Sequence, residues 1–152
     1  MTNKGKYYES QFEEATIEFL REAHWQYAFG DDIHRKYTDP LIEEDLRNFL
    51  SVQYKDKNLT ISEMDSIVAN LRNTGGQNDY YALRNAFLLY RDGYDFAYSD
   101  GRDNPFRLEY IDFEHPDHNI FRCVNQFVME QGRENRRPDI LLFINGIPVC
   151  II

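Results

Sequence analysis

Apolar residues in the first half of the chain recur at the spacing of amphipathic helices. The first helix is predicted to open with a capping box formed by Ser10 and Glu13, and its apolar face is predicted to run from Phe12 to Tyr27. Three further helices are expected to begin at Asp39-Pro40, at Thr60-Ile61-Ser62-Glu63 and at about Asp79, the last ending near Gly93. The pattern therefore predicts a helical region over about 1–93.

The period changes from 3.6 to 2 after Gly93, which predicts a β-rich region over about 94–152. Ile120–Met129 is rich in β-branched and aromatic residues. Two nearly all-apolar runs, Ile140–Ile144 and Ile147–Ile152, flank Asn145-Gly146, the strongest short-range hairpin signal. Strands this apolar indicate a sheet covered on both faces, so helices are expected to pack on it. The pattern predicts one α/β domain.

Composition limits the function classes. Among 152 residues, 26 Asp and Glu against 17 Lys and Arg give a net charge of −9, which argues against a protein that simply coats nucleic acid. A nuclease stays possible, because its metal site needs carboxylates. Two cysteines are too few for a disulfide framework. No apolar run reaches the length of a membrane span and the N-terminus lacks a signal-peptide core, so we expect a cytoplasmic protein without membrane contact.

Two acidic residues are candidate metal ligands. Asp139 follows Pro138 at the start of a buried strand, where its carboxylate can face a hard cation such as Mg2+; ordinary turn chemistry is the alternative. Glu13 lies at the edge of the apolar face of the first helix and could reach the sheet, or it could serve only as the partner of Ser10 in the capping box.

Other polar residues carry weaker signals. Arg133, Arg136 and Arg137 form the one local basic cluster in the sequence, and they either contact DNA phosphates or are solvated loop charges. His115 and His118, in Glu-His-Pro-Asp-His, have metal-ligand chemistry, but their position between two strands favours a polar loop.

The C-terminal third carries several motifs in a fixed order. Asp117–Phe121, Val124–Phe127 and Arg137–Val149 read DHNIF, VNQF and RPDILLFINGIPV. These segments resemble the N-terminal nuclease domain of type I restriction enzyme R (motor/endonuclease) subunits, whose pattern is N-x-F, N-Q-F, R-P-D-I and N-G-x-P, followed by hydrophobic residues and Glu-x-Lys. The match to this pattern is close over about the last 40 residues and looser over the first helix. The segment between Asp31 and Asp103 adds little to the resemblance.

The resemblance implies a restriction-endonuclease-like PD-(D/E)xK fold, with N-terminal helices packed on a mixed β-sheet, and metal-dependent hydrolysis of DNA phosphodiester bonds. It implies Asp139 and Glu13 as catalytic metal ligands and Mg2+ as the cofactor. The family's Glu-x-Lys would follow Ile152. We therefore expect that the 152 residues form the N-terminal part of the endonuclease domain. This part would be incomplete at the C-terminus and unable to cut DNA alone.

For the full-length protein the resemblance implies a host-defence restriction-modification enzyme that translocates double-stranded DNA with ATP and binds modification (methyltransferase) and specificity subunits. ATP binding is expected outside this chain, because no G-x-x-x-x-G-K-[ST] loop occurs in it. Two alternatives stay open: a stand-alone PD-(D/E)xK nuclease of defence or repair, and a non-catalytic interaction module.

Overall fold

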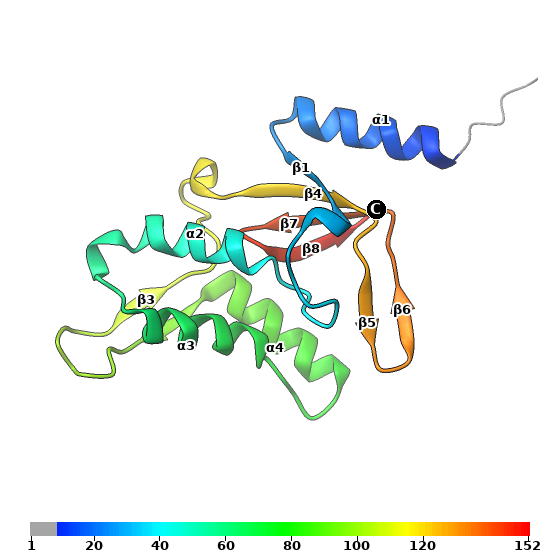
Figure 1. Cartoon of the computed structure of the whole chain (residues 1–152). Coiled ribbons are helices and arrows are strands. Elements are labelled where there is room, and N and C mark those ends of the chain that lie inside the picture. Colours follow the sequence, from blue (N-terminus) through cyan, green and yellow to red (C-terminus); the bar gives the residue numbers. More distant parts are fainter. Residues whose placement is uncertain (1–8) are drawn as a thin grey trace, which may run out of the picture. The chain divides into compact units, whose positions relative to one another are not determined.

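A computed structural model describes residues 9–152, which form two compact units (Figure 1). The first unit contains the chain up to Ile42 together with Ile120–Ile152, and the second contains Glu43–Asn119. The helices within the described residues are α1 (Glu9–Glu22), α2 (Glu43–Gln53), α3 (Ile61–Arg72) and α4 (Asp79–Asp92), with short 3-10 turns at Gly30–Asp32, Lys55–Lys57 and Pro116–His118. The four predicted helices are confirmed. None of the described helices is long and apolar enough to span a membrane.

The first unit is built on a four-stranded mixed sheet of order β1-β4-β7-β8. Its strands are β1 (Gln26–Phe29), β4 (Phe121–Asn125), β7 (Ile140–Ile144) and β8 (Ile147–Ile151). β1 runs parallel to β4, and the other neighbours are antiparallel. A mixed α/β architecture is therefore confirmed. The β7–β8 hairpin lies at one edge of the sheet rather than at its centre.

Strand β1 corrects the prediction of one helix reaching Tyr27. Helix α1 ends earlier because His24 adopts the left-handed conformation, with φ of 67°. The backbone then makes the paired bonds of a Schellman ending, from Trp25 N to Leu20 O and from His24 N to Arg21 O. Glycine usually occupies this position, so a histidine there is not recognisable from the sequence as the end of a helix.

Each face of the sheet packs against its own apolar cluster. On one face, Leu20 of α1 packs with Cys123 and Ile140. On the opposite face, Val124, Leu141 and Phe143 pack with Ile42 and Phe127. Coverage on both faces is therefore confirmed for β4 and β7. Strand β8 is mostly exposed beyond Ile147, because it is an edge strand.

The apolar face predicted for α1 is buried at Leu20, but its two phenylalanines are exposed. Phe12 and Phe19 are 60% and 68% exposed, whereas Leu20 is buried and Ile17 is half-buried. The predicted capping box is also wrong, because α1 begins at Glu9 and places Ser10 inside the helix. Helix α2 likewise begins at Glu43 instead of at Asp39-Pro40.

The hairpin turn joins β7 to β8 at Asn145-Gly146, as predicted. Both residues have positive φ, 51° and 75°, as a type I′ turn requires. The Asn145 side chain is fully buried, and its Oδ1 accepts a hydrogen bond of 2.7 Å from Ile120 N. The Asn145 backbone N–H donates to Ile120 O at 2.8 Å. The asparagine thus ties the hairpin to the start of β4 in addition to forming the turn.

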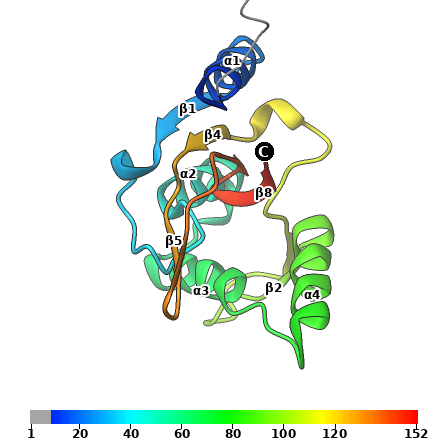
Figure 2. The ribbon, with the colours of Figure 1, turned by 90° about the vertical axis from the view of Figure 1, so that its right-hand side faces the viewer.

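The second unit combines α2, α3 and α4 with a hairpin of β2 (Tyr94–Phe96) and β3 (Phe106–Leu108) (Figure 2). Its fully buried side chains include Leu46, Leu50, Ile67, Val68, Leu108 and Tyr110. Helix α3 starts with a capping box in which Thr60 Oγ1 accepts from Glu63 N and Glu63 Oε2 accepts from Thr60 N. The helix start predicted at Thr60 is confirmed.

The buried Glu63 carboxylate also binds the guanidinium of Arg102 at 2.6 and 2.8 Å. The Arg102 hydrogen bonds, with that from Thr60 N, lower the pKa of Glu63 from 4.5 to about 2. A lowered carboxyl pKa contributes stability above pH 4.5 that is lost as pH falls toward 2. We expect Glu63→Gln to lower the free energy of unfolding at pH 7 and to weaken its fall in acid, measured by urea unfolding from pH 7 to 2. Glu114→Gln, at an exposed site, is the control; equal pH profiles for Glu63→Gln and wild type would contradict the assignment.

Candidate active site

Two adjacent amides and an acid distant in the sequence meet where β4 ends and β7 begins. Asn125 is the last residue of β4 and pairs with Ile140. Gln126 has φ of 58°, which ends the strand, and its N–H donates to Asp139 O at 3.0 Å. The strand predicted over Ile120–Met129 is therefore interrupted here. Asp139 directly precedes β7, and its side chain is exposed to solvent.

Helix α1 brings Glu13 to the same end of β4. Cys123 and Asn125 share a face of the strand because side chains alternate, and Cys123 packs against α1. Asn125 Nδ2 accordingly donates to Glu13 Oε1 at 3.0 Å, and Gln126 Nε2 donates to the same oxygen at 3.3 Å. Within residues 9–152, no hydrogen bond is made to the second oxygen, Oε2. Glu13 is thus held by the sheet rather than by Ser10.

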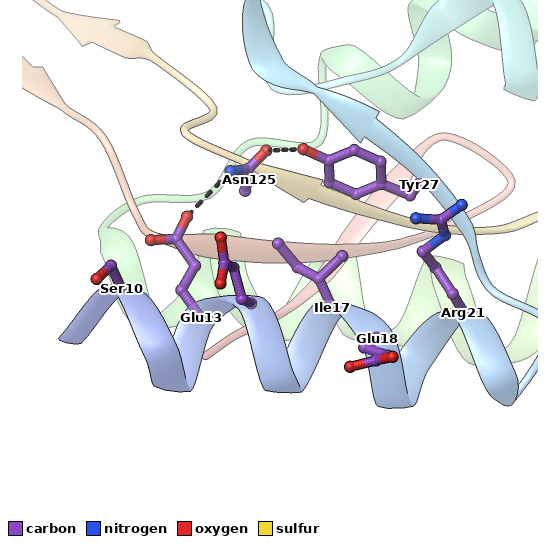
Figure 3. Close-up of a pocket in the computed structure, with 8 residues that line it drawn as sticks. Ser10, Glu13, Ile17, Glu18, Arg21, Tyr27 and Asn125 are labelled. Atoms are coloured by element: carbon purple, nitrogen blue, oxygen red, sulfur yellow. Dashed lines mark hydrogen bonds between the residues drawn. The ribbon is translucent and has the colours of Figure 1, made fainter. Parts of the chain in front are cut away.

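A tyrosine fixes the orientation of the Asn125 amide (Figure 3). Tyr27 Oη donates to Asn125 Oδ1 at 2.8 Å, which leaves Nδ2 directed at Glu13. Burial raises the pKa of Tyr27 above 10, and nearby negative charge, including that of Glu13, raises it further. The phenol therefore keeps its proton at neutral pH and acts as a donor. A flipped amide would place its oxygen against the carboxylate, so the network specifies one orientation.

Glu13 lines a cavity of about 460 Å³. Its lining consists of Ser10, Glu13, Glu14, Ile17, Glu18, Arg21, Tyr27 and Asn125. The carboxylates are hard oxygen ligands of the kind that Mg2+ prefers. Glu13 is the one that side chains of the sheet hold in place, whereas Glu14 is exposed. Asp139 is not among the lining residues. Gln126 therefore links the two acids, because its side chain donates to Glu13 and its backbone N–H donates to Asp139 O.

The arginine cluster lies on a second hairpin, β5 (Met129–Gln131) with β6 (Glu134–Arg136). Arg133 is in its turn, Arg136 ends β6, and Arg137 follows. All three side chains are exposed, and Arg136 forms an ion pair of 3.4 Å with Glu134. None of them lines the cavity beside Glu13. They precede Asp139 directly in the chain, on the way into β7.

The two histidines lie in the second unit, in the polar loop that the sequence predicts. Their rings converge on Asp112, a buried residue that sequence reasoning did not single out. The holding roles of Tyr27, Asn125 and Gln126 were also missed. The sequence signal for these roles was the pair of side-chain amides, Asn125 and Gln126, at the end of a strand, because polar side chains at such a position need hydrogen-bond partners.

Residues 6–152 match the sequence family described as type I restriction enzyme R protein N terminus. The chain belongs to this family. It is 26% identical over 153 residues to the type I restriction enzyme HindI endonuclease subunit of Haemophilus influenzae, covering 94% of this chain and 14% of that protein. It is 28% identical over 147 residues to a Methanocaldococcus jannaschii protein that bears the name of type I restriction enzyme MjaIXP endonuclease subunit, covering 91% and 14%.

The chain thus spans about one seventh of the length of these two relatives. Family membership supports a nuclease at the level of the family, and it agrees with the resemblance of the C-terminal motifs. The Asn-Gln pair of that motif is the pair that holds Glu13.

Proposed function

We propose that this chain contributes to the nuclease site of a type I restriction enzyme R subunit, and that the full-length subunit hydrolyses DNA phosphodiester bonds with Mg2+. The observation that carries the proposal is the fixation of Glu13 by Asn125 and Gln126 at the strand end that also bears Asp139. The mixed sheet, with its apolar β7–β8 hairpin and the packed α1, is compatible with the PD-(D/E)xK fold, which we include in the proposal.

The donor set fits a hard divalent cation. Asp139 has an exposed carboxylate, and Glu13 has an oxygen that makes no hydrogen bond among the described residues. When bound, Mg2+ supplies stabilisation of negative charge on the phosphoryl oxygens and a more acidic water. Asn125 and Gln126 would keep the Glu13 carboxylate in one position, so that the site is formed before DNA binds. DNA phosphates would be bound by the three arginines that precede Asp139 in the chain, Arg133, Arg136 and Arg137.

The strand register gives the proposal a further support. Leu141 pairs with Ile151, and Ile152 N donates to Ile140 O at 2.9 Å. A residue that continued β8 would then pair with Asp139. In the family pattern Glu-x-Lys follows these hydrophobic residues, so this register would bring the second acid opposite Asp139, on the same face of the hairpin.

We extend the proposal to the whole protein only through its family. The full-length subunit would act in the cytoplasm, use ATP to translocate double-stranded DNA, and assemble with modification and specificity subunits. We propose that ATP-driven translocation resides outside these 152 residues, and by itself the chain is expected not to cut DNA.

Neighbouring glutamates on α1 provide a matched test of the site. In the full-length protein assembled with its partner subunits, Glu13→Gln should slow Mg2+-dependent DNA cleavage by roughly 100-fold or more, because metal-ligand contacts contribute several kcal/mol to transition-state stabilisation. Glu14→Gln, which changes an exposed carboxylate in the same cavity, should cleave within about twofold of wild type, because among the described residues no sheet side chain hydrogen-bonds to Glu14. Normal cleavage by Glu13→Gln would refute the proposed role of Glu13.

A further inference from the structure

The loop between β3 and β4 gathers two imidazoles and a carboxylate. His118 Nδ1 lies 3.0 Å and His115 Nδ1 lies 3.6 Å from the same oxygen, Asp112 Oδ2. The two rings stack with centroids 4.9 Å apart at an angle of 18°. One ligand atom from each of the three residues lies within 4.8 Å of the others. This arrangement belongs to the second unit and shares no residue with the proposed nuclease site.

The carboxylate of Asp112 is fixed by the protein. It is 5% exposed, its Oδ1 accepts from the backbone N–H groups of Glu114 and His115, and its Oδ2 accepts from Gln53 Nε2 at 3.0 Å. The Asn119 side chain closes the loop by accepting from Asp112 N and donating to Asp112 O.

Hydrogen bonding explains only part of this geometry. The His118 contact is a hydrogen bond, but the 3.6 Å between His115 Nδ1 and Asp112 Oδ2 is too long for one. A tetrahedral Zn2+ with bonds of about 2.0–2.1 Å holds its ligand atoms about 3.3 Å apart. The two observed distances lie on either side of that value. Two imidazoles with one carboxylate form a donor set suited to Zn2+ and similar transition metals rather than to Mg2+.

We propose that Asp112, His115 and His118 bind one Zn2+ ion. Asp112 supplies the preformed anchor, and the two histidines, whose side chains are 60% and 50% exposed, let the ion reach it from solvent. A water would complete the fourth position. Because three ligands come from one loop that already has its shape, the ion would fasten the segment Asp112–Asn119 that leads into β4. The inference does not depend on the proposed nuclease activity.

Cobalt titration tests the site without any activity measurement. Purified protein is freed of metal with a chelator, placed in excess Mg2+ to occupy hard-cation sites, and titrated with Co2+ while its visible absorption is recorded. We expect one equivalent of Co2+ to bind with the spectrum of a four-coordinate site, and Zn2+ to displace it. His115→Ala and His118→Ala should each weaken binding at least about tenfold. His34→Ala, which removes an exposed histidine outside the cluster, should leave binding unchanged.

Each outcome decides the matter. Loss of binding in the two cluster variants, with His34→Ala normal, supports the site. Failure of the wild type to bind Co2+, or equal affinity in wild type and in the His115→Ala/His118→Ala double variant, overturns it. Circular dichroism checks that the variants fold, which their exposed positions favour. If the double variant unfolds, the single variant His118→Gln is titrated with Co2+ instead. Wild-type affinity for Co2+ in this variant would contradict the proposal.

Discussion

Asp139→Ala in the full-length R subunit should abolish DNA cleavage while ATP hydrolysis continues. The Asp139 side chain is exposed at the start of β7, so its truncation removes a proposed metal ligand without opening a cavity. Loss of the metal removes both charge stabilisation and water activation, which together change rates by orders of magnitude. The measurement is a cleavage assay beside an ATPase assay on the assembled enzyme.

An exposed aspartate elsewhere provides the control for this substitution. Asp56→Ala, in the 3-10 turn Lys55–Lys57 of the second unit, should leave both activities near wild type. Retained cutting by Asp139→Ala would remove Asp139 from the mechanism. Loss of cleavage and ATPase together would point to a folding defect instead of the loss of a metal ligand.

The largest effect on stability is expected from Asn145→Ala. Asn145 is fully buried, has φ of 51° and accepts the hydrogen bond of Ile120 N through its side chain. Alanine would leave that N–H without its partner and would adopt the left-handed region less readily than asparagine. We expect the free energy of unfolding to fall by roughly 2–4 kcal/mol, measured by urea denaturation.

Two further substitutions separate the causes. Asn145→Gly keeps the positive φ accessible but still loses the amide, so its loss of stability should be smaller than that of alanine. Asn135→Ala, at an exposed position of β6, should change stability by no more than about 0.5 kcal/mol. Wild-type stability for Asn145→Ala would show that the amide bond to Ile120 contributes nothing.

Local signals predicted the elements that local interactions form. The capping residues Thr60 and Glu63 and the glycine at Gly93 set the limits of α3 and α4, because the relevant hydrogen bonds span only a few residues. The Asn145-Gly146 turn was predictable for the same reason. Strand β1 was not, since it pairs in parallel with β4 almost a hundred residues later, and a histidine ends the helix before it.

The candidate site was predictable in its residue types and unpredictable in its contacts. The motifs around Asn125 and Asp139 carried the family resemblance, but the bond from Asn125 to Glu13 depends on which face of α1 meets the sheet. The sequence favoured a face that contains Phe12, Phe19 and Leu20, of which the structure buries Leu20 and exposes both phenylalanines. Spacing alone could not show which face of α1 packs on the sheet, because apolar residues occur on both faces of this helix.

The histidine loop shows the same limit. His115 and His118 were recognised as possible ligands, whereas their acid is Asp112, not the adjacent Glu114 or Asp117. Their convergence results from a turn in which Asp112 accepts backbone N–H groups two and three residues ahead. An aspartate followed by such a turn is a recognisable local motif, and it was the available signal.

The most direct test of the central claim is the position of a bound ion. Crystals of the full-length subunit grown with Mn2+ in place of Mg2+ would locate the metal by its anomalous scattering. We predict a peak coordinated by carboxylate oxygens of both Glu13 and Asp139, with Asn125 and Gln126 still bonded to Glu13. A peak on Asp139 alone, with Glu13 too distant to coordinate it directly or through water, would contradict the claim that α1 contributes a ligand to the nuclease site.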